Sequence, residues 1–126
     1  MKAKKFPPRF ARDGVRGNVA LWFQPYVKGE RPKVESCQNY LIQPLHKGET
    51  KPRRAIGTIR VTSCIVVALG DVTQDEAQAA GYSDKFGLRR RMEHKINDGH
   101  ELPDDTALWR IEWVVIQDDS RSAVAA

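Results

Sequence analysis

The chain has 126 residues, of which 40% are hydrophobic and 29% are charged, a composition typical of a soluble globular protein with its own core. No apolar stretch approaches the roughly 20 residues that a membrane-spanning helix needs, so we expect no membrane insertion. The basic N-terminus is not followed by the apolar segment of an export signal, which indicates a cytoplasmic protein.

Charge is distributed unevenly along the chain. Residues 1–60 contain 14 Lys or Arg and 4 Asp or Glu, whereas residues 61–126 contain 7 and 12, so the halves carry net charges of +10 and −5. A positive half of this size attracts polyanions before any specific contact forms. We therefore expect nucleic acid as a partner, with a surface that only keeps the protein soluble as the alternative.

The N-terminal half contains short elements separated by basic loops. Residues 6–17 predict a turn and a short helix, because consecutive prolines suit a first helical turn and a glycine can end it. Residues 19–23 and 37–43 are strand candidates. Residues 24–34 and 44–54 contain proline, glycine and several cations, which is typical of loops.

The clearest periodicity begins in the middle of the chain. Residues 59–67 alternate with a period of two and are rich in β-branched side chains, which predicts a strand. The side chains that should share one face of this strand are Ile59, Val61, Ser63, Ile65 and Val67.

Two short helices and a final strand are expected next. Thr73 and Glu76 have the spacing of a capping box. A second helix should begin at Ser83 or Asp84 and end at residues 97–99. Its apolar positions recur every four residues, at Leu88, Met92 and Ile96. Residues 108–115 predict the last strand and 120–126 a disordered tail, so residues 1–119 are expected to form a single domain.

Three short motifs lie in a fixed order in the second half of the chain. They are Gly70-Asp71-Val72-Thr73 after a strand, Gly81-Tyr82 between two helices, and Ile111-Glu112-Trp113 in the final strand. This order resembles the ASCH domain of the PUA-like superfamily, whose members mostly act on RNA or modified nucleosides. The resemblance implies an α+β fold, a small PUA-like mixed β-barrel with two or three short helices. Residues 6–11 resemble the start of some phage and bacterial ASCH-like proteins.

The ASCH motif Gly-x-Lys-x-x-(Glu or Thr)-x-Arg is not matched by the corresponding segment. Val19 stands at the lysine position, Trp22 at the acidic or hydroxyl position and Gln24 at the arginine position. An apolar side chain can neither form a charged contact with phosphate nor act as a general base. Residues 29–31 and 48–53 combine glycine with cations and are displaced alternatives. The sequence therefore favours a protein that is not an enzyme, and no catalytic residue is assigned.

Other patterns that would indicate a metal site or a disulfide are missing from the sequence. His46, His94 and His100 do not have metal-ligand spacing, so we expect neither a metal nor another cofactor. Cys37 and Cys64 are expected to be unpaired, because disulfides are rare in proteins that are not exported.

The expected nucleic-acid interface combines phosphate-binding cations with rings that stack on unpaired bases. The cations assigned to it are Lys4, Lys5, Arg9, Arg12, Arg16, Lys28, Arg31, Lys33, Lys51, Arg53 and Arg54. The rings assigned to it are Trp22, Tyr26 and Tyr40, although ordinary burial preference favours the core for Trp22 and Tyr40. Residues 89–91 are three arginines, which suit a solvated helix face, a second phosphate-contacting edge or an acidic protein partner.

Three hypotheses of function follow from the sequence. The preferred one is a non-catalytic RNA-binding or other nucleic-acid-binding module that uses the basic half and the barrel cleft. The second is a hydrolase or ribonuclease acting on a nucleoside or RNA through a displaced lysine and a carboxylate such as Glu30, Glu49 or Glu112. The third is a phage-type inhibitor that binds a host protein or nucleoprotein complex.

Overall fold

The computed structural model describes residues 1–17, 19–46, 48–51 and 54–119. The expected disordered tail at 120–126 lies outside the described residues, as do Arg53 and the side chain of Arg9.

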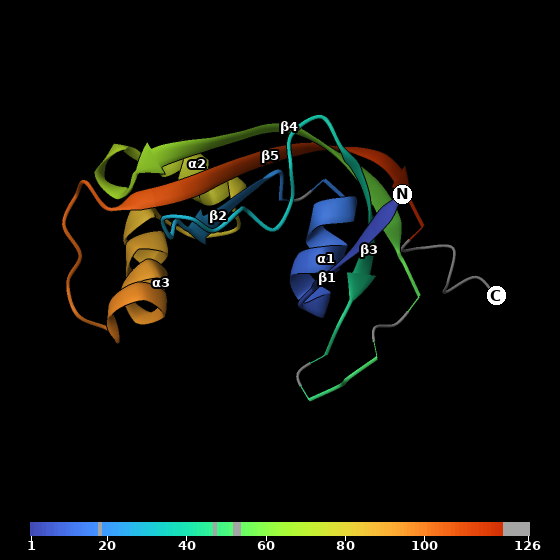
Figure 1. Cartoon of the computed structure of the whole chain (residues 1–126), viewed down its shortest axis with the longest axis horizontal. Helices are drawn as coiled ribbons and strands as arrows, with labels where there is room; N and C mark the ends of the chain where they lie inside the picture. Colours follow the sequence, from blue (N-terminus) through green and yellow to red (C-terminus); the bar gives the residue numbers. More distant parts are fainter. Residues whose placement is uncertain (18, 47, 52–53, 120–126) are drawn as a thin grey trace.

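A five-stranded mixed sheet forms the centre of the structure, with the strand order β1-β3-β4-β5-β2. Figure 1 shows α1 near one end of the long β4–β5 pair, and α2 and α3 near the other. β1 runs parallel to β3, and the remaining neighbours are antiparallel. This arrangement confirms the predicted α+β fold with short helices. The strands are β1 (Lys2–Phe6), β2 (Leu21–Pro25), β3 (Asn39–Pro44), β4 (Gly57–Ala68) and β5 (Ala107–Asp118), and the helices are α1 (Pro8–Val15), the 3-10 turn η1 (Leu69–Asp71), α2 (Gln74–Ala79) and α3 (Lys85–Asn97).

β1 was not predicted from the sequence. Its five residues include three lysines, and only Phe6 is buried, so no apolar alternation marks it as a strand. Its conformation comes from parallel pairing with β3, which runs in register from Lys2 opposite Tyr40 to Phe6 opposite Pro44. A strand that depends on a distant partner in this way leaves little local signal.

β4 was predicted as a strand, but the faces of its second half were assigned incorrectly. The pairing with β5 shifts between Val61 and Ser63, which leaves Thr62 as an extra residue on β4. One extra residue turns the following side chains to the other face. Ile65 is therefore 49% exposed, whereas Cys64 packs against the core.

Two hydrophobic clusters lie on opposite faces of the β2–β5 pair. Leu21 and Phe23 of β2 belong to the cluster that contains residues of α2 and α3, whereas Trp22 packs against the cluster that contains residues of α1. On β5, Leu108 belongs to the first of these clusters and Trp113 to the second. Because side chains alternate along a strand, each strand contributes to both clusters.

The C-terminal helices begin where the sequence predicted. The capping box is present, with Thr73 Oγ1 accepting from the Glu76 amide at 3.1 Å, and Asp84 caps α3. Leu88 and Met92 are buried as expected, but Ile96 is 40% exposed. Figure 1 shows the last turn of α3 extending away from the sheet, which explains this difference. Among the described residues, no helix combines the length and apolar character needed to cross a membrane.

Candidate nucleic-acid interface

The two edge strands of the sheet approach each other through aromatic side chains. The rings of Phe6 on β1 and Trp22 on β2 meet edge to face, with centroids 5.4 Å apart. Phe10 of α1 lies against both, with ring centroids 5.4 Å from Phe6 and 6.1 Å from Trp22. The curled sheet is thus brought together at this point by ring packing between its first and last strands.

Lys33 lies in the gap between these edge strands. Its backbone amide donates to Gln24 Oε1 on β2 at 2.9 Å, and its ammonium group donates to the Lys5 carbonyl on β1. The same ammonium group lies 4.0 Å from the ring centroid of Phe6 and 5.8 Å from that of Trp22. Rings attract a cation held over their faces. One residue therefore connects the two edges of the sheet.

The charges of two other lysines act on Lys33. Burial, followed by the charges of Lys4 on β1 and Lys95 on α3, lowers the pKa of Lys33. Burial and the charge of Arg91 lower the pKa of Lys95 in the same way. None of the ion pairs found among the described residues includes any of these four cations. We call the group Lys4, Lys33, Arg91 and Lys95 the cationic gap; its mutual repulsion would be relieved by an anion.

Comparisons with solved structures identify the fold that carries this gap. No known protein-family profile and no curated protein sequence matches the chain. Protein EF3133 from Enterococcus faecalis matches 98% of this chain and 81% of its own with a TM-score of 0.69 and 15% identity. An ASCH domain from Lactobacillus crispatus matches 92% of this chain and 79% of its own length, with a TM-score of 0.63 and 18% identity. ASCH from Zymomonas mobilis matches 97% of this chain and 76% of its own length, with a TM-score of 0.57 and 12% identity. The chain has the ASCH fold. The fold implied by the order of the sequence motifs is thereby confirmed.

The ASCH fold brings part of the predicted interface together. Lys4 and Lys33 lie at the gap between β1 and β2, where the Lys33 ammonium group donates to the Lys5 carbonyl. The Lys5 side chain is exposed and, because side chains alternate along a strand, points to the other face from Lys4. Lys51 and Arg54, in contrast, lie in the loop between β3 and β4, which Figure 1 shows hanging below the sheet, well separated from α3. These two cations therefore do not share a surface with Lys95.

The remaining predicted cations are spread over two further segments. Arg12 is exposed on α1 and Arg16 follows that helix directly. Lys28 and Arg31 are exposed in the segment between β2 and β3, where Arg31 forms an ion pair with Glu35 at 3.7 Å. The structure thus divides the basic half of the sequence into several separate groups.

Two of the three predicted stacking rings are occupied by contacts within the fold. Tyr40 is 4% exposed, and its hydroxyl accepts a hydrogen bond from the Glu35 amide at 2.7 Å, which places it in the core and removes it from the interface. Tyr26 packs against Trp109 with ring centroids 5.4 Å apart. Trp22 is partly buried and borders the gap.

Sequence reasoning did not assign Lys95 to the interface. Residues 89–91 were interpreted as a solvated helix face, a second phosphate-contacting edge or a site for an acidic protein, and both Arg91 and Lys95 are exposed. Their spacing of four residues, which puts both side chains on one side of a helix, was the available signal. The charge of Lys95 is one of the causes that lower the pKa of Lys33, and this depends on how α3 packs beside β2.

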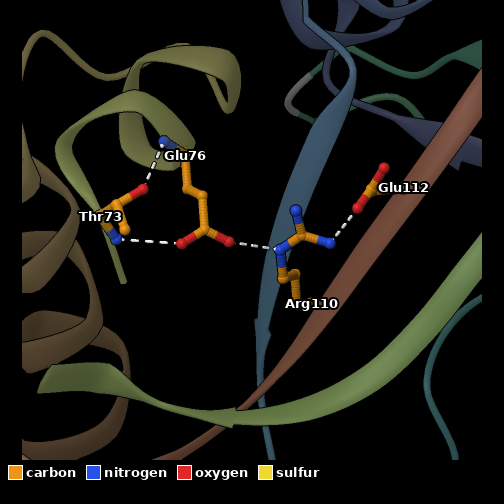
Figure 2. A network of polar contacts seen from close by, with 4 residues as sticks. All are labelled: Thr73, Glu76, Arg110 and Glu112. Atoms are coloured by element: carbon orange, nitrogen blue, oxygen red, sulfur yellow. Dashed lines mark hydrogen bonds and ion pairs between the residues drawn. The ribbon is translucent and has the colours of Figure 1, made fainter. Parts of the chain in front are cut away.

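A second polar network joins α2 to β5 and is drawn in Figure 2. Arg110 Nε donates to Glu76 Oε2 at 2.5 Å, and the same guanidinium group donates to Glu112 Oε1. Burial raises the pKa of Glu76, but hydrogen bonds from Thr73 and Arg110 outweigh this effect and hold it below the usual range. Glu112 lies between Ile111 and Trp113, which belong to the core cluster around α1, and accepts from Arg110 on the other face of the strand.

This network sets the expected effect of replacing Arg110 with methionine. The loss of the guanidinium group leaves Glu76 and Glu112 without their shared donor and should destabilise the protein by roughly 1–2 kcal/mol. Glu76 has a lowered pKa in the folded state, so its contribution is present above its unfolded value of 4.5 and is lost as the pH falls below it. Urea denaturation at neutral pH should show the full difference from wild type, and denaturation at pH 3 a smaller one.

Arg90→Met, on the exposed side of α3, is the matched control and should change the free energy of unfolding little. A loss for Arg110→Met that is independent of pH would contradict the role given to Glu76.

Proposed function

We propose that the protein is a non-catalytic module that binds RNA, or another single-stranded nucleic acid, at the cationic gap. The observation that carries the proposal is the environment of Lys33. Its half-buried ammonium group contacts a backbone carbonyl and two ring faces, and the charges that act on it are those of Lys4 and Lys95. A phosphate supplies the negative charge that would stabilise this group, and release of its counterions favours binding.

RNA is the favoured nucleic acid because of the fold and of the ring beside the gap. The ASCH resemblance implies a superfamily that mostly acts on RNA or modified nucleosides. Trp22 borders the gap and can offer its accessible part to an unpaired base from outside. The cavity between α1 and the sheet measures about 10 Å³, roughly the space needed for one water molecule, so a base does not fit in it.

The surroundings of Val19 and Glu112, two positions that a hydrolase site would use, favour a protein without catalytic activity. Val19, at the motif's lysine position, is 6% exposed and belongs to the core. Glu112 is paired in register with Leu21 and is bound by Arg110, on the face of β2–β5 opposite Trp22.

Replacing Lys33 with methionine is expected to weaken the binding of a short unstructured RNA about tenfold, because one phosphate contact is lost. The slope of log affinity against log salt concentration should fall by about one unit for the same reason. Fluorescence anisotropy with a labelled RNA, repeated at several salt concentrations, measures both quantities.

Lys85→Met is the matched control, since Lys85 is exposed at the first residue of α3, is not among the cations assigned to the interface, and changes the net charge equally. It should retain nearly all of the affinity. Equal losses in both variants would mean that overall charge, and not the cationic gap, attracts the RNA; an absence of binding at low salt would remove the proposed function altogether.

A further inference from the structure

On the face of the sheet that carries Trp22, helix α1 covers only one end of the β4–β5 pair. It packs against Trp113 there, whereas α2 and α3, near the other end of the pair in Figure 1, contribute to the hydrophobic cluster on the opposite face. The register places Val66, Trp109 and Gln24 side by side across β4, β5 and β2, on the Trp22 face and beyond α1. Val66 is 48% exposed, so this end of the face is open.

Two aromatic rings lie on this open end. Tyr26, which follows β2 directly, packs against Trp109 with ring centroids 5.4 Å apart and an angle of 57° between the ring planes. Its amide donates to the Ala107 carbonyl at 3.3 Å, which holds the residue beside β5. Tyr26 remains 37% exposed, and Val27 next to it is 50% exposed. We call Tyr26, Trp109 and Val66 the aromatic platform.

The aromatic platform borders Lys33. The amide of Lys33 donates to Gln24 Oε1 at 2.9 Å, next to the platform, while its ammonium group lies 5.8 Å from the ring centroid of Trp22. Trp22 and Trp109 are diagonal neighbours on adjacent antiparallel strands, because Trp22 pairs with Ile111, and such neighbours lie about 7–8 Å apart. A phosphate at Lys33 and a nearby base of the same strand can therefore contact the protein at the same time.

Resting on the proposed nucleic-acid binding, we propose that an unpaired base stacks on the aromatic platform while Lys33 holds a neighbouring phosphate of the same strand. Exposed rings beside a lysine fit a nucleotide, which combines a flat base with an anion, better than an apolar peptide, which has no charge for Lys33. The platform makes the module selective for single strands, because bases paired within a duplex are stacked on each other and do not reach it.

Replacing Tyr26 with leucine tests the stacking, because leucine keeps an apolar side chain and removes the ring. The affinity for a short unstructured RNA, measured by fluorescence anisotropy, is expected to fall at least about fivefold, the lower end of the usual contribution of base stacking. The slope of log affinity against log salt concentration should stay the same, since no phosphate contact is lost, in contrast to Lys33→Met. Tyr26→Phe keeps the ring and should keep the wild-type affinity.

Phe86→Leu is the matched control for Tyr26→Leu. It removes a ring that is 70% exposed near the start of α3 and does not belong to the aromatic platform. It should leave the affinity unchanged, and both leucine variants should have the circular dichroism of the wild type.

A strand of the same length that consists of abasic residues gives a second readout, because it keeps the phosphates and has no base to stack. It should bind the wild type about as weakly as the intact RNA binds Tyr26→Leu. Tyr26→Leu should not weaken the binding of the abasic strand further, since the two changes remove the same contact. An equal loss for intact and abasic strands would mean that Tyr26 acts through the fold, and would overturn the inference.

The failure of this inference can be told apart from that of the proposed function. Wild-type affinity of Tyr26→Leu, together with a loss for Lys33→Met, would overturn the inference and leave the proposed function intact. A loss for Tyr26→Leu without one for Lys33→Met would support stacking on the platform and overturn the assignment of the phosphate to Lys33. An absence of RNA binding by the wild type at low salt would remove both proposals.

Discussion

Replacing Gly57 with alanine is expected to destabilise the protein by roughly 3 kcal/mol or more, because the first side-chain atom cannot be accommodated. A Cβ at this position would lie 2.6 Å from the Gln117 carbonyl oxygen and 2.8 Å from Val15 Cγ1. The first is backbone of the neighbouring strand, and the second belongs to a side chain that is 1% exposed, so neither can withdraw easily. Urea denaturation followed by circular dichroism measures the loss.

Gly87→Ala is the matched control for this change. The nearest atom to a Cβ at Gly87 is Asp84 Oδ1 at 3.6 Å, an ordinary contact, and the position lies within α3. Alanine favours a helix over glycine by up to about 1 kcal/mol, so this variant should be as stable as the wild type or slightly more stable. A Gly57→Ala protein of normal stability would show that α1 and the start of β4 do not approach as closely as described.

Replacing Trp113 with alanine is expected to cost about 3–5 kcal/mol, the usual range for removal of a large buried ring. Trp113 is 7% exposed, its ring centroid lies 5.9 Å from that of Phe10, and its Nε1 donates to the Gly14 carbonyl at 3.3 Å. The ring therefore attaches α1 to β5. Hydrogen exchange should show that amides of α1 lose protection before those of α3, in addition to the lower midpoint of denaturation.

Trp113→Phe provides the graded control, because it keeps most of the apolar surface and loses the hydrogen bond to Gly14. It should lose about 1–2 kcal/mol. Trp109, which is only partly buried, should also tolerate truncation better than Trp113. Equal effects of alanine at Trp109 and Trp113 would contradict the central position given to Trp113 in the α1 cluster.

Elements whose hydrogen bonds close locally were predictable from the sequence. Thr73 and Glu76 satisfy each other's amides within one turn, and Asp84 caps α3 through an amide three residues away, so the residue types alone identify both helix starts. β1 and the faces of β4 were not predictable. The first depends on pairing with β3 and the second on the position of Thr62 opposite β5, and both are set by distant parts of the chain.

The candidate site was also predictable only in part. A basic N-terminal half was evident from the sequence, and Lys4 and Lys33 were among its candidates. Which cations converge depends on how the sheet curls and on where α3 packs, so Lys95 was missed and Lys51 was grouped with residues from which the fold separates it. The burial of Val19 agrees with the unmatched motif, because an apolar residue at that position serves the core.

The outer edges of β1 and β2 have a consequence for solubility. An open strand edge is a template on which a strand from another molecule can add. Lys2, Lys4 and Lys5 follow one another closely along β1, and strand addition there would bring their charges against a second chain. Lys33 further occupies the Lys5 carbonyl, one of the acceptors that an added strand would use. The lysines proposed to hold phosphate would thus also protect the protein against edge-to-edge aggregation. A variant that lacks several of them would lose phosphate binding and this protection together.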